Sequence, residues 1–291
     1  MACFHIFSEK EDFTEGIFGQ ILKWLMDTIH HLDKNNTNLM LSFDINALAY
    51  DNIIPTFIQP NEIHQEFDNK INVKTYNISN GAGFDLEPAS FKKANKLWNK
   101  YFKFSKQVED LVPLFTKNET LGVHYRGTDK MFDNSQTNPM SQDEFIYIIR
   151  DFLSKHEEIK AIYCCSDEES FINNIRKNFN NIKVIEYKQL RSIDTTSRAF
   201  FQNGYNINKQ LKDNLTIGAL VDMISLSRCE YVIKTSSALS AFSKIIQPDL
   251  KIYTVSAMKE RWFPTAMIEP YKSDSEKVLS ILKRTLYGNA V

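Results

Sequence analysis

The sequence predicts an α/β protein with mostly parallel sheets, divided into two domains. Short apolar runs alternate with longer stretches of helical periodicity along the chain. A strand, a helix and a further strand form a right-handed crossover, which places helices on both faces of a parallel sheet. The 291 residues exceed the usual size of one domain, and a polar break that contains Pro113 interrupts the pattern near residues 112–120.

The alternation assigns the elements in chain order. Apolar runs bounded by polar turns are expected to be strands, and amphipathic stretches between them are expected to be helices. The expected strands are Cys3–Phe7, Leu39–Phe43, Leu121–Tyr125, Ile159–Cys165, Lys183–Glu186, Tyr231–Lys234 and Lys251–Val255. The expected helices are Gly19–Asp33, Ser90–Phe104, Ser141–Ser154, Glu168–Phe179, Leu215–Leu226, Leu239–Ile246 and Ser275–Leu286.

The polar break divides these elements into two groups. We predict an N-terminal α/β domain over residues 1–115 and a nucleotide-binding domain over residues 119–272, where the alternation is more regular. Residues 273–291 carry the last helix, and we expect this helix to pack back on the N-terminal domain.

Composition excludes several classes of protein. Hydrophobic residues make up 43% of the chain and charged residues 24%, so a folded core is expected. Lys+Arg (35) and Asp+Glu (36) nearly cancel, without the basic excess of a nucleic-acid binder. No run approaches the ~18 apolar residues of a membrane span. The few cysteines and the lack of a signal peptide predict a cytoplasmic protein.

Ligands of parallel α/β sheets bind at the carboxyl ends of the strands, so the residues after each strand are the candidates for a site. The first candidate segment runs from His124 to Lys130. Arg126 and Lys130 are cations suited to phosphate, and Gly127 permits a close backbone approach. The alternative is a surface turn held by an ion pair between Arg126 and Asp129.

Two acidic segments are further candidates. Asp167 follows the strand that ends near Cys165, although Ser166 and the acids after it also fit an ordinary helix start. Asp222 lies inside an apolar helical pattern, where a buried acid needs a partner. Its carboxylate could accept two hydrogen bonds from a guanine edge, and an exposed position on the helix is the alternative.

A hydroxyl-rich turn follows the strand Tyr231–Lys234. Three adjacent hydroxyl residues, which include Ser236 and Ser237, precede a helix, where backbone N–H groups and the helix dipole bind anions. A plain N-cap is the alternative. Near the start of the chain, Gly16 and Gly19 form a weaker glycine turn, which we expect to approach a donor molecule closely. The histidines and cysteines show no metal-ligand spacing, and no P-loop is present.

These segments, in this order, resemble motifs of the α1,6-fucosyltransferases, the nodulation fucosyltransferases and, more distantly, the protein O-fucosyltransferases. Residues 122–130, Gly-Val-His-Tyr-Arg-Gly-Thr-Asp-Lys, resemble the family's Gly-Val-His-x-Arg-Arg-Thr-Asp-Lys. Residues 166–168 resemble its Thr-Asp-Asp, and Asp222 with residues 226–237 resembles its last motif. Residues 16–20 resemble its N-terminal Gly-x-Gly turn. The likeness covers residues 121–246 well and the first half loosely.

The resemblance implies a GT-B arrangement, in which two Rossmann-like domains face a cleft that holds GDP-fucose. It implies an inverting, metal-independent fucosyltransferase without a cofactor, whose partners are a nucleotide sugar and a glycan acceptor. The N-terminal domain would face the acceptor. Arg126 would bind the β-phosphate, and the backbone of His124 and the side chain of Asp222 would lie near guanine. Ser236 and Ser237 would hold the diphosphate.

The chain departs from the family pattern at two places. Gly127 stands where the family usually has a second arginine, which removes a cation from the predicted donor site. Asn134 stands at the position of a carboxylate that serves as general base in part of the family, so we take the adjacent Asp133 as the candidate base. These departures leave two alternatives: another nucleotide sugar such as UDP-xylose or GDP-rhamnose, or a non-catalytic sugar-nucleotide or glycan-binding protein.

Overall fold

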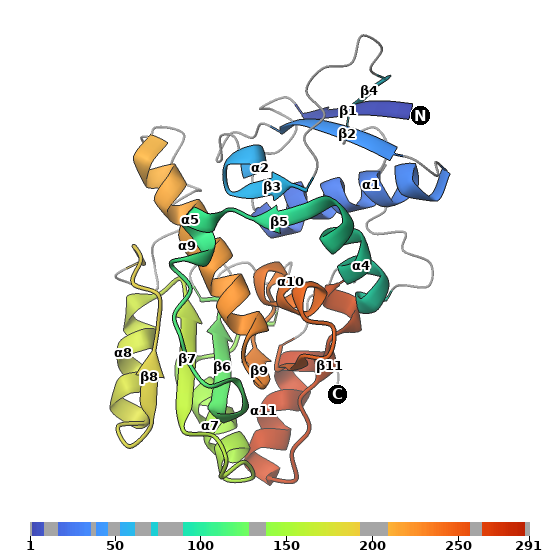
Figure 1. Ribbon diagram of the computed structural model, residues 1–291. Coiled ribbons are helices and arrows are strands. Elements are labelled where there is room, and N and C mark those ends of the chain that lie inside the picture. The colour runs from blue at the N-terminus through green and yellow to red at the C-terminus, as the bar shows by residue number, and fades with distance from the viewer. Residues whose placement is uncertain are drawn as a thin grey trace. The chain divides into compact units, whose positions relative to one another are not determined.

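The protein is described by a computed structural model, in which two compact units each contain a parallel sheet (Figure 1). The structure describes residues 2–8, 17–35, 39–45, 53–61, 71–74, 90–127, 138–192, 209–256 and 264–288. The first unit comprises residues 1–111, 204–221 and 262–264, and the second comprises residues 112–203, 222–261 and 265–291. The predicted α/β class is confirmed.

The second unit is built on a six-stranded parallel sheet with the strand order β11-β10-β9-β6-β7-β8. Its central strand β6 pairs with β7 on one side and with β9 on the other. The carboxyl ends of these three strands therefore meet at one edge of the sheet. The strands are β6 (Thr120–Tyr125), β7 (Ala161–Ser166), β8 (Lys183–Ile185), β9 (Tyr231–Lys234), β10 (Lys251–Thr254) and β11 (Glu269–Pro270).

Helices cover both faces of this sheet (Figure 1). One face packs against α7 (Gln142–Leu153), α8 (Glu169–Asn178) and α11 (Glu276–Tyr287), and the other carries α10 (Ala238–Ile246) and the end of α9 (Lys209–Ser227). A short 3₁₀ helix, η3 (Lys117–Glu119), precedes β6, and η4 (Thr265–Met267) precedes β11. Helix α7 begins with a capping box between Ser141 and Glu144.

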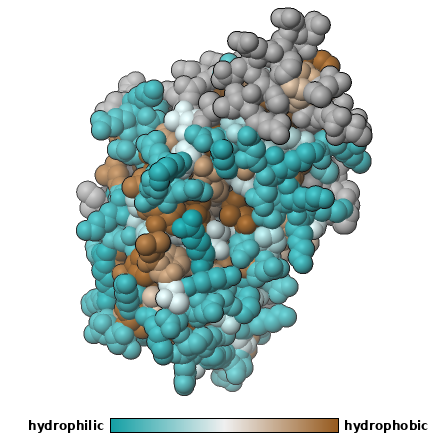
Figure 2. Space-filling model, viewed as in Figure 1, coloured by the Kyte–Doolittle hydropathy of each residue, from teal (hydrophilic) through white to brown (hydrophobic). Residues whose placement is uncertain are grey.

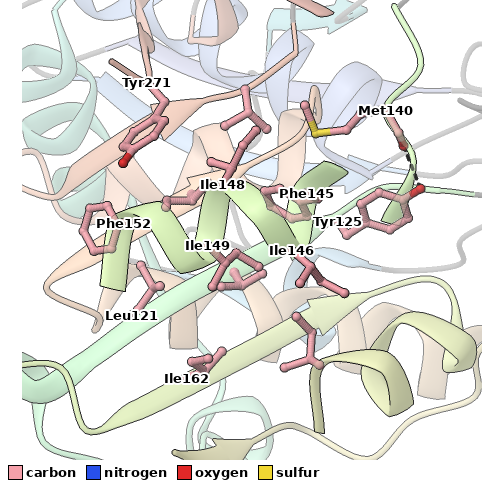
Figure 3. Close-up of a cluster of buried hydrophobic side chains, with 14 of the residues drawn as sticks. Leu121, Tyr125, Met140, Phe145, Ile146, Ile148, Ile149, Phe152, Ile162 and Tyr271 are labelled. Carbon is pink, nitrogen blue, oxygen red and sulfur yellow. Dashed lines mark hydrogen bonds between the residues drawn. The ribbon is translucent and has the colours of Figure 1, made fainter. Parts of the chain in front are cut away.

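The core of the second unit fills the space between the sheet and α7 (Figure 3). Every residue of β6 and β7 is buried, as two-sided cover of a parallel sheet requires. The ring of Tyr125 stacks on Phe171 with the centroids 4.5 Å apart, and its hydroxyl donates to the carbonyl of Met140 at 2.9 Å. This bond ties the chain before α7 to the end of β6.

Gly122 explains how the opposite face of the sheet is covered so closely. A Cβ atom at this position would lie 2.9 Å from both the Leu226 and the Val232 side chains and 3.1 Å from Sγ of Cys229. Glycine in the middle of β6 therefore lets the end of α9 pack tightly against the sheet.

The first unit contains a parallel three-stranded sheet with the order β2-β1-β4 and an antiparallel pair of β3 with β5. The described elements are β1 (Ala2–Ser8), the π-helical segment η2 (Ile17–Leu22), α1 (Lys23–Asn35), β2 (Leu39–Ile45), α2 (Ile53–Thr56), β3 (Ile58–Pro60), β4 (Ile71–Lys74), α4 (Phe91–Tyr101), β5 (Phe102–Phe104) and α5 (Lys106–Glu109). Lys100 and Tyr101 at the end of α4 both bond to Asp33 of α1.

Two expectations differ from the structure. The helix expected over residues 90–104 ends at Tyr101, because Phe102–Phe104 forms a strand that pairs with Ile58–Pro60. The last helix, expected against the N-terminal domain, belongs to the second unit, where Val278 and Leu282 of α11 join the core beside α7.

Most of the surface drawn in Figure 2 is hydrophilic, and apolar side chains show in a smaller area near the centre of the view. Among the large apolar residues that are exposed, Leu114 stands out with 90% of its surface accessible. None of the helices in the described ranges combines the length and apolar character that a membrane crossing needs.

Candidate functional site

The candidate site lies at the edge of the second unit's sheet where β6, β7 and β9 end. Their registers place Tyr125 beside Ser166 and His124 beside Lys234. The segments that follow these strands are therefore neighbours, although more than a hundred residues separate the first from the last. Cross-links between them fix the geometry of this edge.

Arg126, the first residue after β6, is held from two sides. Its backbone N–H donates to Oγ1 of Thr235 at 2.7 Å, and Nη1 of its guanidinium lies 3.3 Å from Oδ2 of Asp167. Oδ1 of Asp167 accepts the backbone N–H of Gly127 at 3.0 Å. With about 20% of its side chain exposed, Arg126 can still reach a ligand. The structure thus brings Arg126 and Asp167 together, with Asp167 as the residue that positions the arginine.

The space beside Gly127 is occupied by Glu168. A Cβ at position 127 would lie 2.1 Å from Oε1 of Glu168, whose residue is completely buried. Oε2 of Glu168 accepts a hydrogen bond from Nε2 of Gln142 at 2.7 Å, which holds the carboxylate in place. Only glycine therefore fits at position 127 while Glu168 keeps this position.

We expect Gly127→Ala to lower the free energy of unfolding by about 2 kcal/mol, because a buried carboxylate must leave its partner Gln142. Urea unfolding measures this change. The double variant Gly127→Ala/Glu168→Ala should recover part of the loss in a double-mutant cycle, since the obstructing side chain is absent. Simple additivity of the two single effects would contradict the proposed steric conflict.

The hydroxyl-rich turn after β9 leads into α10. The backbone N–H of Thr235 donates to the carbonyl of His124 at 3.0 Å, and that of Ser236 donates to Oγ of Ser256 at 2.8 Å. Ser237 is the N-cap residue of α10, and its side chain makes no capping bond. The ordinary N-cap interpretation therefore does not account for this hydroxyl, which lies where the helix dipole favours an anion.

The side chain of His124 is buried and joins β6 to α10. Its Nδ1 lies 2.7 Å from Oγ of Ser240 in the first turn of α10. Burial, with Lys234 and Arg126 nearby, holds the pKa of His124 well below its ordinary value, so the ring is neutral at pH 7. Because its carbonyl accepts from Thr235, His124 joins β6 to the turn after β9.

Lys234, the last residue of β9, is buried to 98%. Burial lowers the pKa of its ammonium from 10.5 to about 7, and no carboxylate of the described chain offsets this effect. A lysine without a counter-charge at a strand end is a common sign of a functional position.

Asp222 of α9 is buried, not exposed on the helix. Its Oδ1 accepts from the Tyr163 hydroxyl and its Oδ2 from Nε2 of Gln189, both at 2.6 Å. Burial raises the pKa of Asp222 to about 6, although the bond from Tyr163 opposes this rise. The carboxylate therefore already has two donors within the protein, one on each oxygen.

The raised pKa of Asp222 predicts a pH-dependent stability. Burial of the protonated carboxyl contributes fully to the free energy of unfolding below its unfolded pKa of 3.8. This contribution is lost as the pH rises through about 6 and the carboxyl ionises. From pH 4 to pH 7.5, the wild-type protein should lose about 2 kcal/mol relative to Asp222→Asn, which cannot ionise. Urea unfolding of both proteins across this range checks the prediction, and parallel pH profiles would contradict it.

Several predicted site residues lie outside the described part of the chain. These are Gly16, Lys130 and Asp133, and Asp129 is also among them. Gly19 is described and lies inside the helical segment η2 rather than in a turn, with open space where its Cβ would be. In the described ranges, no three His, Cys, Asp or Glu side chains gather as metal ligands would.

Sequence reasoning missed Ser240 and Ser256, which hold the segments of this edge together. Ser256 could have been found, because it follows the strand β10 at the same edge. Thr235 and Glu168 lay inside the predicted segments, but their bonds to Arg126 and Gln142 depend on distant parts of the chain.

Comparisons with known proteins concern the fold. No family model matches the sequence, and no curated protein matches it either. Among solved structures, NodZ α-1,6-fucosyltransferase co-crystallised with GDP has a TM-score of 0.50 at 11% identity, covering 88% of this chain and 96% of that one. An Arabidopsis thaliana FUT1 mutant in complex with GDP has a TM-score of 0.48 at 12% identity, over 94% and 74%. POFUT1 in complex with GDP-fucose scores 0.45 at 10% identity, over 86% and 97%.

Only the first of these likenesses is strong enough to support a statement about the fold. It extends over both units rather than the second alone, so it includes the half in which the sequence motifs were weak. The resemblance inferred from the motifs is thereby confirmed at the level of the fold. This chain has the fold of the NodZ α-1,6-fucosyltransferase.

Proposed function

We propose that this protein is an inverting, metal-independent glycosyltransferase that transfers L-fucose from GDP-fucose to a hydroxyl group of a glycan. The main support for this proposal is the position of Arg126. Asp167 and Thr235 hold it next to the turn that leads into α10. A guanidinium next to a helix N-terminus is an arrangement suited to a diphosphate. The fold shared with a GDP-bound fucosyltransferase supports the same proposal.

In the proposed reaction, the acceptor oxygen attacks the anomeric carbon while the bond from that carbon to the diphosphate oxygen breaks. Asp133 takes the proton of the acceptor hydroxyl. Arg126 and Lys130 stabilise the negative charge on the departing GDP, and the helix N-terminus at Ser237 adds its dipole. These groups take the part that a metal ion plays in other transferases.

The remaining predicted residues bind the donor in this proposal. Ser236 and Ser237 lie at the diphosphate. The backbone of His124 and the carboxylate of Asp222 lie toward guanine. The cysteines are buried and unpaired, as suits the cytoplasmic location that we propose.

A thermal-shift screen against GDP, UDP, GDP-fucose and UDP-sugars tests the proposal. A ligand at 100 times its dissociation constant stabilises the folded state by about 2.7 kcal/mol, which moves the melting temperature by a few degrees. We expect GDP and GDP-fucose to produce this shift and UDP to produce none. No shift with either guanine nucleotide would overturn the proposal.

A second candidate is supported by the contact between Gly127 and Glu168. This contact places a carboxylate where the resembling family has a cation, which favours a donor other than GDP-fucose or a protein that binds without transfer. UDP-xylose and GDP-rhamnose therefore belong in the same screen. Release of GDP from GDP-fucose separates the enzyme from the binding protein, because only the enzyme hydrolyses or transfers the donor.

A further inference from the structure

Lys234 is buried at the end of β9, where the chain leads into α10. Lys234 lies in register with His124 on the neighbouring strand, so both side chains lie on the same face of the sheet. His124 bonds to Ser240 in the first turn of α10 and is electrostatically coupled to Lys234. Three residues after Lys234, the N-cap residue Ser237 begins this helix.

This lysine has no counter-charge among the described residues. Buried cations are normally paired, because desolvation of an unpaired charge is costly. Arg191, which is also buried, obeys this rule, since its Nη1 lies 2.9 Å from Oε2 of Glu186. No charged partner offsets the burial of Lys234 within the described ranges, and the ring of His124, which is coupled to it, is neutral. The local field therefore favours a negatively charged ligand.

The charge of the site leads to the same conclusion. Arg126 is paired with Asp167 at 3.3 Å, so part of its charge is already neutralised. The buried carboxylate of Glu168 lies next to Gly127 and adds negative charge. A diphosphate that binds here needs a further cation, and Lys234, at the strand end that leads into α10, can supply one.

We propose that Nζ of Lys234 binds a phosphate oxygen of the nucleotide diphosphate and serves as a second cation of the donor site. This inference rests on the proposed function and adds to it a residue for which the motifs assign no role. No carboxylate in the described ranges pairs with Lys234, and a bound diphosphate would supply the counter-charge. The bound anion then favours the protonated form of the side chain.

Calorimetric titration of Lys234→Met with GDP and with guanosine tests this contact. Methionine preserves the length and apolar stem of lysine, so the fold should be retained. Loss of a buried charge-assisted bond should weaken GDP binding roughly 10- to 100-fold. Guanosine has no phosphate, so its affinity should be unchanged.

The number of protons taken up when GDP binds is a second measurement. It would not change if Lys234 had only a structural role. At pH 8, GDP binding should bring close to one proton onto Lys234, which is measured by titration in buffers of different ionisation enthalpy. Among the described residues, the titratable group coupled to Lys234 is His124, whose lowered pKa keeps its ring neutral at this pH. Protons that GDP itself takes up or releases are accounted for by subtracting the proton uptake measured with Lys234→Met.

Lys244→Met is the matched control. Lys244 also lies on α10, its pKa is lowered by burial, and its Nζ donates to the carbonyl of Leu250 rather than lying beside the turn. This variant should bind GDP as the wild-type protein does. Equal GDP affinity of Lys234→Met and the wild type would overturn the inference and leave the proposed function standing. Failure of the wild type to bind GDP would overturn both.

Discussion

Replacing Arg126 by alanine is expected to lower the rate of GDP release from GDP-fucose by about 10²–10³-fold, the usual effect of removing one group that stabilises developing negative charge. Its guanidinium is held by Asp167 at the edge where the diphosphate is proposed to bind. About a fifth of each side chain of this ion pair is exposed, so urea unfolding of the variant is measured beside its activity to show that it remains folded. Turnover of GDP-fucose with and without a glycan acceptor provides the measurement.

Arg150→Ala is the control for this experiment. Arg150 of α7 is exposed and donates to Oδ1 of Asn178 on α8, away from the edge formed by the strand ends. Its removal should leave turnover unchanged. Arg126→Lys should lie between the two, because lysine keeps the charge but loses the planar fork. Near-normal turnover of Arg126→Ala would contradict its assigned role.

Lys234→Met is expected to increase the free energy of unfolding at pH 6 by about 5 kcal/mol. The pKa of Lys234 falls from 10.5 in the unfolded chain to about 7 in the folded protein, at about 1.4 kcal/mol for each tenfold change in proton affinity. A depressed pKa contributes stability above pH 10.5 that is lost as the pH falls through 7. The advantage of the variant should therefore be largest below pH 7.

Urea unfolding of both proteins between pH 6 and pH 10 checks this expectation. The difference between the two should shrink as the pH rises and approach zero near the upper limit. A constant difference would show that packing rather than charge distinguishes methionine from lysine. Together with weaker GDP binding, greater stability of the variant would identify Lys234 as a residue retained for its function at the expense of stability.

Local sequence patterns predicted the elements that form the second unit. The strands from β6 to β10 agree with the expected ranges within a few residues, because apolar runs of this kind suit a sheet covered on both faces. The helices between them were also expected, although α9 begins at Lys209, six residues before the expected start at Leu215. Strands of the first unit such as β3 and β5 were missed. Each has only three residues, and Phe102–Phe104 was read as the end of a helix because its pairing with Ile58–Pro60 depends on distant sequence.

The candidate site was predictable to the extent that it follows strand ends. Arg126, Asp167 and Ser237 were found in this way, and the structure brings their segments together. Burial could not be predicted in the same way. Lys234 was recognised as a strand residue, but the loss of solvent around its ammonium depends on α10 and β6, as the satisfied carboxylate of Asp222 depends on Tyr163 and Gln189.

The four cysteines have a practical consequence. All are buried thiols: Cys3 lies in the sheet of the first unit, and Cys164, Cys165 and Cys229 lie in the second. Burial raises the pKa of Cys164 and Cys229, so the reactive thiolate is suppressed as well as shielded. Alkylation of Cys3 therefore reports when the first unit opens, and alkylation of the other three reports on the second. The alkylation rates of these native thiols, followed by mass spectrometry, therefore measure the opening of each unit separately without an engineered cysteine.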